Sequence, residues 1–342
     1  NGNILNVDRN GYGSELDMDK FVYNYLTING EKSNRLDYVR DLGTDYASYN
    51  DIKAGQTSGN YRYNQLGELT RDLQEGMILH WRYGDHKLQR IERTDQDSPE
   101  VEFIYNPLGV RVGKLVKPRQ NGQLQSINNW TMYYYVYDAN GQLMAVYDSK
   151  IYSSTRETVL SEQYIYGSER VGVIQQGLTV FENGVIQPST SPLVEHTLGQ
   201  KRYELKNHLG TVNVTISDRK TYNSLEDAFE ATVTNYAETY PFGMVMPNRS
   251  FNADGQRYGF HGMEQDPELK GAGNSYTTEF RQYDPRLGRW KSVDELMYMF
   301  PELSPYVGFD NNPIYFVDPF GLSSEPSTGE SSGEGNNGGG DY

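Results

Sequence analysis

Aromatic residues recur two positions apart through the first half of the chain, and each pair is followed by Asn or Asp and then by Gly. On a β-strand, residues two apart point to the same face, so each pair predicts a strand with an aromatic face. The Asn or Asp and the Gly favour a tight hairpin turn, after which a second strand is expected to return. The clear copies are 61–67, 103–109 and 135–141, with returning strands at 110–116 and 142–147, and looser copies lie at 21–25, 81–84 and 164–167.

These repeated hairpins predict an all-β fold. One hairpin is only marginally stable in water, so neighbouring units are expected to pair edge to edge. A period of roughly 20 to 30 residues is typical of such repeating architectures. We therefore predict a spiral antiparallel β-sheet of hairpins that forms part of a shell. An ordinary antiparallel barrel or sandwich is the alternative.

Three later segments depart from the hairpin pattern. A Pro- and Ser-containing stretch at 187–193 predicts a connector, and Ser224, with acidic residues after it, predicts a short helix over 224–231. Residues 294–300 predict one or two helical turns ended by Pro301. The final run, 323–342, is rich in Ser, Gly, Glu and Asn and has no residue able to anchor a core, so we expect it to be disordered.

Composition narrows the classes of function. The chain has 342 residues, 29 of them Tyr, a formal net charge of −15 and no Cys. The acidic balance argues against nucleic-acid binding, which needs Lys and Arg to displace counterions. The lack of Cys excludes disulfides, thiolate metal sites and a Cys nucleophile. No apolar run reaches the roughly 18 residues of a membrane helix, and since the first residue is not Met we expect a piece of a longer protein.

No metal or cofactor site is predicted. The histidines show no ligand spacing to one another or to a carboxylate pair. Gly-rich stretches such as 271–273 are not followed by Lys and a helix, so they predict no phosphate loop, and Ser nucleophile signatures are absent. The histidines are His80, His86, His196, His208 and His261.

Residues 283–322 form the last stretch expected to be ordered. Asp318-Pro319-Phe320-Gly321 has the residue order of a type I turn, and Asp294 stands where a helix would begin. One interpretation gives the two carboxylates only these structural roles. The other is peptide hydrolysis, in which closely packed Asp residues divide into a neutral acid and an ionised base that activates water. Phe316, Phe320 and Leu322 are expected to anchor the end of this stretch in the core.

The stretch also resembles the Rhs repeat-associated core family, the YD-repeat proteins that include Rhs polymorphic toxins and Tc toxin C components. The hairpin units resemble YD repeats. The residues that carry the resemblance are Arg281, Tyr283-Asp284-Pro285, Gly288-Arg289-Trp290, Ser292, Asp294, Asn311-Asn312-Pro313 and Asp318-Pro319-Phe320-Gly321-Leu322, with looser likeness in the turn at 206–210 and in the segments 240–244 and 258–264.

The resemblance implies an aspartyl autoprotease that cuts its own chain after Leu322, before Ser323. Asp294 and Asp318 would be the catalytic pair, and Arg281, or as a second candidate Arg289, the supporting cation. It implies no other enzymatic activity and no cofactor.

By the same resemblance, the chain divides into a YD-like repeat sheet at 1–200, a core with the autoprotease at 201–322 that plugs the shell, and a tail or effector remnant at 323–342. The implied partners are a C-terminal toxin or effector segment, secretion-apparatus proteins and immunity proteins. The implied setting is a bacterial protein, secreted or at the cell surface, that acts in interbacterial competition.

The alternatives are a non-catalytic surface or adhesion module, because aromatic β-repeats also serve as interaction scaffolds, and a glycosidase, for which no acidic pair stands beside an aromatic subsite.

Overall fold

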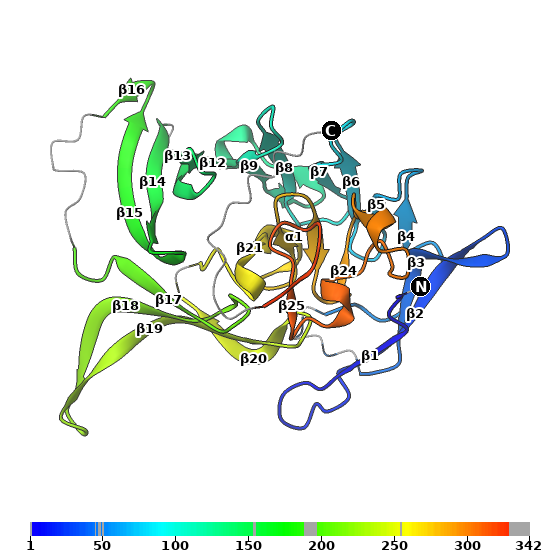
Figure 1. Ribbon diagram of the computed structural model, residues 1–342. Helices are drawn as coiled ribbons and strands as arrows, with labels where there is room; N and C mark the ends of the chain where they lie inside the picture. The colour runs from blue at the N-terminus through cyan, green and yellow to red at the C-terminus, as the bar shows by residue number, and fades with distance from the viewer. Residues whose placement is uncertain are drawn as a thin grey trace, which may run out of the picture.

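One large antiparallel sheet dominates the computed structural model, which describes residues 2–44, 46, 49, 51–152, 155–187, 197–253 and 255–327 (Figure 1). Within these residues fifteen strands pair in the order β20-β19-β18-β17-β15-β14-β13-β12-β9-β8-β7-β6-β5-β4, with β16 beside β15. Chain neighbours are mostly neighbours in the sheet, as hairpins require, and the predicted all-β antiparallel class is confirmed. The strands are β4 (Tyr61–Tyr63), β5 (Leu69–Asp72), β6 (Met77–Trp81), β7 (Leu88–Arg93), β8 (Glu100–Tyr105), β9 (Arg111–Lys117), β12 (Thr131–Tyr137), β13 (Leu143–Tyr152), β14 (Thr155–Tyr166), β15 (Arg170–Glu182), β16 (Val185–Ile186), β17 (Lys201–Lys206), β18 (Val212–Asn223), β19 (Ala228–Thr239) and β20 (Val245–Asn252).

The repeated turn chemistry predicted from the sequence closes these hairpins. The Asn106 side chain accepts hydrogen bonds from the backbone N–H groups of Leu108 and Val110, at 2.9 and 3.0 Å. Asp138 accepts from the residues at the same offsets in its own unit. The Gly of each clear unit has a positive φ, between 80° and 86°, a conformation that glycine adopts without steric cost. The turn is therefore encoded locally in each repeat.

The helix predicted at 224–231 is wrong. Residues 224–227 form the tip of a long hairpin, and β19 begins at Ala228. Asn223 binds the backbone N–H of Leu225 at 3.0 Å and Asp227 is left-handed, with φ of 48°, so the capping residues make a turn instead of starting a helix. The connector expected at 187–193 lies outside the described residues except for Gln187.

A smaller sheet of β1 (Asn6–Arg9), β2 (Asp19–Ile28) and β3 (Glu31–Asp41) adjoins the first strands of the large sheet. Its buried Phe21 and Val39 join one hydrophobic cluster with Ile91 and Val101 of the large sheet, and Leu269 of the C-terminal segment belongs to the same cluster. A minor hairpin, β10 (Arg119–Gln120) and β11 (Gln123–Leu124), and the 3₁₀ turn η1 (Ile127–Asn129) lie between β9 and β12.

The C-terminal segment forms the predicted plug, because the large sheet curves around it in Figure 1. Its centre is an aromatic cluster in which Phe309, fully buried, contacts the rings of Phe260, Tyr283 and Trp290. Burial of one such ring contributes about 1.5–3 kcal/mol. The plug elements are η2 (Phe260–Gly262), β21 (Glu264–Gln265), α1 (Pro267–Lys270), β22 (Tyr276–Thr277), β23 (Gln282–Asp284), β24 (Arg289–Trp290), η3 (Met297–Met299), η4 (Phe309–Asn311), β25 (Phe316–Val317) and β26 (Glu325–Pro326).

Buried ion pairs join the plug to the large sheet. Lys270 of α1 contacts Asp72 of β5 at 3.1 Å, and Lys114 of β9 contacts Asp266 at 3.4 Å, with every one of these side chains 2% exposed or less. Arg111 of β9 pairs with the same Asp266. Charges this deeply buried must be paired, so the plug has one favoured position on the sheet.

Order continues past Leu322, contrary to our prediction. Residues 325–326 form β26, which pairs antiparallel with β25. Phe320 was expected to be a buried anchor but is 58% exposed, whereas Phe316 packs on the aromatic cluster. The rest of the predicted tail, 328–342, lies outside the described residues.

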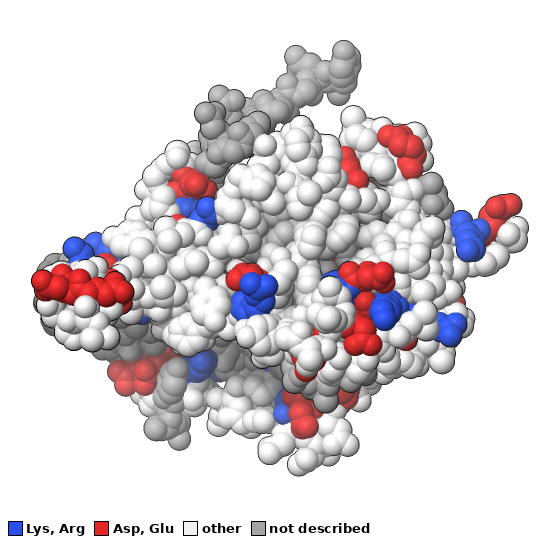
Figure 2. Space-filling model, turned by 90° about the horizontal axis from the view of Figure 1, so that it is seen from below, with Lys and Arg blue, Asp and Glu red and all other residues white. Residues whose placement is uncertain are grey.

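Charge is distributed in small groups on the face seen in Figure 2. Lys and Arg side chains stand there beside Asp and Glu, and one mainly acidic group lies at the left end. Arg249 and Glu238 form one exposed ion pair, at 2.8 Å. No helix among the described residues is long and apolar enough to cross a membrane.

The joint between β15 and β17 requires a glycine. A Cβ at Gly172 would lie 2.2 Å from the carbonyl oxygen of Arg202 on the paired strand, whereas a Cβ at Gly167 would meet nothing closer than 3.7 Å. We therefore expect Gly172→Ala to lower the free energy of unfolding by about 1–3 kcal/mol, as overpacking does. Chemical denaturation measures this, and Gly167→Ala is the matched control. Equal stability of the two variants would show that the joint relaxes freely.

Candidate functional site

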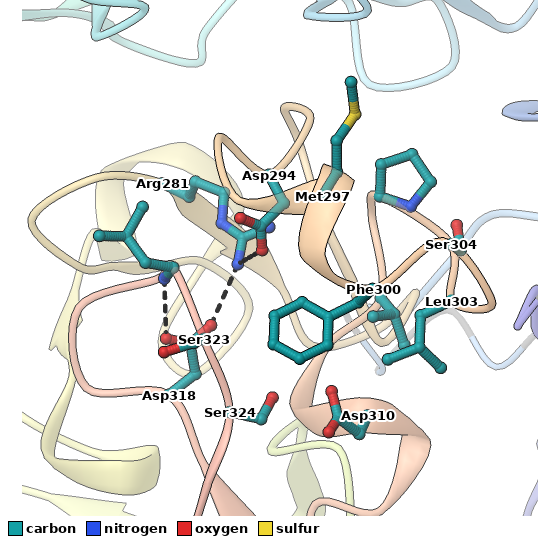
Figure 3. A pocket seen from close by; sticks show the side chains of 13 residues that line it. Arg281, Asp294, Met297, Phe300, Leu303, Ser304, Asp310, Asp318, Ser323 and Ser324 are labelled. Carbon is teal, nitrogen blue, oxygen red and sulfur yellow. Dashed lines mark hydrogen bonds and ion pairs between the residues drawn. The ribbon is translucent and has the colours of Figure 1, made fainter.

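Asp294 and Asp318, proposed from the sequence as a pair, meet at one guanidinium group (Figure 3). Nη2 of Arg281 lies 2.7 Å from Oδ2 of Asp294 and 3.1 Å from Oδ2 of Asp318. Because both carboxylate oxygens contact the same nitrogen, the two oxygens cannot be farther apart than the sum of these two distances. The arrangement puts two carboxylates in one electrostatic environment.

Asp318 stands directly after β25 and caps the turn that leads to Leu322. Its Oδ1 accepts hydrogen bonds from the backbone N–H groups of Gly321 and Leu322, at 2.7 and 2.9 Å. The residue is 1% exposed. The turn role expected from the sequence is therefore present, and it holds the carboxylate beside the backbone of Gly321 and Leu322.

Asp294 reaches the site from the other side. Its backbone N–H donates to the carbonyl of Pro305 at 2.9 Å, which ties the segment after β24 to a distant loop. Oδ1 accepts from the N–H of Leu296 at 2.8 Å, as expected at the start of a helical turn, and η3 follows. Its side chain is 14% exposed, so Asp294 is the carboxylate that solvent can reach.

Arg281 is held rigidly between the two carboxylates. Its guanidinium lies 4.6 Å from the ring centre of Trp290, and its Nε donates to the carbonyl of Gly321. The remaining nitrogen, Nη1, is buried and has no hydrogen-bond partner among the described residues. A buried donor without a partner is costly, so Nη1 can take a further acceptor at this position.

Burial has the largest effect on the pKa values of Asp294 and Asp318. Burial raises the pKa of Asp318 to about 6, although Arg281 and the two N–H groups oppose the rise. Burial also raises the pKa of Asp294, again against the effect of Arg281. Raised carboxyl pKa values beside a cation are typical of acid–base sites.

A cavity of about 20 Å³ lies between the carboxylates and the segment after them. That is room for one water molecule. Leu322 and Ser323, which flank the peptide bond singled out from the sequence, both line it. Sequence reasoning missed several lining residues, because contributions from separate loops leave no local signal: Met297, Phe300, Leu303, Ser304 and Asp310.

Arg289, the second candidate for the cation, does not contact the pair. Its guanidinium lies 5.2 Å from the ring centres of both Tyr25 and Tyr306, and it donates to the carbonyl of Asn34 at 2.6 Å. Arg289 therefore joins the plug to the small sheet. Arg281 is the cation of the site.

The histidines of the described residues lie in separate segments of the chain. His80 and His86 contact single glutamates, and no group of three or more potential metal ligands occurs among the described residues. His208 and His261 lie in turns of the later half of the chain, and His196 falls outside the described residues.

Comparison with known proteins finds similarity in sequence to a toxin subunit and similarity in fold to solved structures. No family model matches the sequence. Toxin subunit YenC1 of Yersinia entomophaga is 30% identical over 251 residues, which cover 68% of this chain and 23% of YenC1. The crystal structure of TcdB2-TccC3-Cdc42 aligns with a TM-score of 0.54 at 17% identity, over 89% of this chain and 13% of that chain. The TcdB2-TccC3-TEV structure gives 0.49 at 16% identity, over 91% and 17%.

These similarities indicate the general class of protein. The sequence similarity relates the chain to Tc toxin subunits, and the structural alignment shows a shared fold. The chain spans about a quarter of the length of the curated relative that it matches.

Proposed function

We propose that this chain is part of a β-shell scaffold of the Tc or Rhs toxin type and that it cuts its own backbone between Leu322 and Ser323. One observation carries the proposal: two carboxylates of raised pKa share Arg281 beside a cavity lined by both residues of that bond. The reaction is hydrolysis, with Asp294 and Asp318 as the acid–base pair.

The roles of the two carboxylates follow from their surroundings. Asp318 is the more buried, and its pKa of about 6 keeps a substantial fraction of it protonated in mild acid, so it is the proton donor to the Leu322 carbonyl. Asp294 lies closer to Arg281 and is the more exposed of the two, so it is the carboxylate that takes a proton from water. The unpaired Nη1 of Arg281 is available to the developing oxyanion.

The steps balance without a cofactor. Water in the cavity adds its oxygen to the Leu322 carbonyl carbon while its proton moves to Asp294 and the proton of Asp318 moves to the carbonyl oxygen. The C–N bond to Ser323 then breaks, the nitrogen takes the proton from Asp294, and the new carboxylic acid returns a proton to Asp318. The products are a carboxyl group at Leu322 and an amino group at Ser323.

The setting of the reaction belongs to the proposal as well. A scaffold that curves around its plug suits the enclosure of a segment following Ser323, and the partner is then a C-terminal toxin or effector segment. Similarity to a bacterial toxin subunit supports a bacterial, secreted protein. Secretion-apparatus and immunity proteins remain further proposed partners.

The raised pKa values predict cleavage with a mildly acidic optimum. The reaction needs Asp318 protonated and Asp294 ionised, so its rate should fall by about tenfold per pH unit above the Asp318 pKa of about 6 and should fall again in stronger acid, where Asp294 becomes protonated. Freshly synthesised chain, sampled by intact mass over time between about pH 4 and 8, gives this profile. Glu302→Gln, at an exposed carboxylate, should reproduce the wild-type curve. A rate that does not change with pH would contradict the acid–base assignment.

A further inference from the structure

Two histidine-containing turns, 206–210 and 258–264, stood out in the sequence and have no role in the reaction described so far. The two turns pack against each other. The N–H of Val212 donates to the carbonyl of Gly259 at 3.1 Å, and the N–H of His261 donates to Oγ1 of Thr211 at 3.0 Å. The two turns therefore form one unit, the histidine bracket, defined here by His208 and His261.

Both histidines bind the segment that precedes β25 and Asp318. Nε2 of His261 lies 3.2 Å from the carbonyl oxygen of Pro313, and Nε2 of His208 lies 3.3 Å from that of Ile314. A carbonyl oxygen only accepts, so each Nε2 carries the proton and donates. The histidine bracket thus donates hydrogen bonds to two consecutive backbone carbonyls just upstream of β25.

His208 also binds the other limb of the loop that contains the bond to be cut. Its carbonyl oxygen accepts a hydrogen bond from the hydroxyl of Ser327. The N–H of Ser327 in turn donates to the carbonyl of Tyr315 at 2.9 Å, and Val317 pairs with Glu325 between β25 and β26. The loop 318–324 is therefore closed at its base, with His208 touching both limbs.

His261 is the fixed half of the bracket. Its ring stacks on Phe260 with centres 3.7 Å apart, and it packs edge-on against Phe309 of the aromatic cluster. Burial lowers the pKa of His261 to about 3, so the imidazole is neutral at ordinary pH and Nε2 stays a single, defined donor. His208 is exposed, so its side chain can be changed without opening the core.

We propose that His208 and His261 are positioning residues for self-cleavage, which hold both limbs of the loop 318–324 so that the bond after Leu322 stays beside the two carboxylates. The inference rests on the proposed function. Its physical basis is that a displacement of about 1 Å from a reactive geometry costs up to about a hundredfold in rate. Neither histidine touches the reacting atoms; each acts through the backbone that it binds.

The test uses paired substitutions in the whole chain and follows the fraction cut at Leu322 over time by intact mass. His208→Ala removes one donor at an exposed site, and we expect cleavage to slow several-fold, while His261→Leu should slow it by about tenfold or more. His208→Gln and His261→Gln restore an N–H near the Nε2 position and should recover most of the rate. His80→Ala, at an exposed histidine that contacts Glu92, is the matched control and should cut at the wild-type rate.

The outcomes separate the two proposals. A wild-type chain that stays intact overturns the proposed function itself. Wild-type cleavage with unchanged rates in His208→Ala and His261→Leu overturns the bracket alone. Gln variants that cut as slowly as the Ala and Leu variants also overturn it, because the donated hydrogen bond would then not be the cause.

A second readout needs no cleavage. In an Asp318→Asn chain, which we expect to remain uncut, the Ser327 amide should be protected from hydrogen exchange by its bond to Tyr315, and adding His208→Ala should speed that exchange at least several-fold. Unchanged exchange of the Ser327 amide would show that the His208 side chain, bound to Ile314, does not order the bond between Tyr315 and Ser327.

Discussion

Asp318→Asn should leave the chain folded and abolish the cut after Leu322. The Asn side-chain oxygen can still accept from the N–H groups of Gly321 and Leu322, so the turn should persist. The variant has no proton to give to the Leu322 carbonyl, and loss of a positioned acid costs about 10²–10⁴ in rate. Intact mass after prolonged incubation should show full-length chain only.

A matched control separates chemistry from turn formation. Asp138 caps the turn of a repeat, accepting from the N–H groups of Asn140 and Gln142 at 2.9 and 2.8 Å. Asp138→Asn makes the same chemical change in a similar turn, at a position where other repeats already carry Asn, such as Asn64 and Asn106. It should cut like the wild type. Cleavage by Asp318→Asn at the wild-type rate would remove Asp318 from the mechanism.

Arg286→Met should lower the free energy of unfolding by about 3–5 kcal/mol, the usual cost of removing one partner of a buried ion pair. Arg286 is fully buried and contacts Glu75 of the large sheet at 2.7 Å and Asp284 of the plug at 3.3 Å. The substitution removes the ion-pair partner of Glu75 and one partner of Asp284, which keeps its contact with Lys270 at 2.7 Å. Arg62→Met, at an exposed position on β4, should stay within about 0.5 kcal/mol of the wild type by denaturant unfolding.

The pH dependence gives this prediction a second test. Burial favours the neutral form of Glu75, but Arg286 outweighs it and lowers the pKa to about 2. A lowered carboxyl pKa contributes stability above its unfolded value of 4.5 that is lost as the pH falls toward 2. Without Arg286, Glu75 can relieve its buried charge by taking up a proton. The deficit of Arg286→Met should therefore be largest near neutral pH and shrink in acid; an equal deficit at every pH would show that lost packing dominates.

The hairpins could be predicted because their signal is local. The side chain of Asn106 or Asp138 and the Gly after it lie within one turn, so a few residues contain the whole interaction. The same locality misled us at 224–231, where Asn223 and the left-handed Asp227 complete a turn and strand pairing decides the rest. Propensity is a weak guide where two long strands pair.

The site could be predicted only in part. Carboxylate chemistry and the resemblance to a family singled out Asp294 and Asp318, but the sequence could not decide between Arg281 and Arg289, because both precede Asp294 in one short stretch. The packing partners of the two arginines decide it: Arg281 packs on Trp290 and contacts the pair, whereas Arg289 packs on Tyr25 and Tyr306 away from it. The pairing of β26 with the preceding strand β25 was invisible in its sequence, since it rests on backbone pairing and not on a side-chain pattern.

The most direct test of self-cleavage is the mass of the chain after synthesis in water enriched in oxygen-18. Hydrolysis by Asp294 and Asp318 predicts a fragment that ends at Leu322 and carries one heavy oxygen in its new carboxyl group. The fragment that begins at Ser323 should carry a heavy oxygen only at its own C-terminus, where release from tRNA during synthesis places one. A chain that remains full length through the mildly acidic range, or a cut at any other bond, would contradict the account.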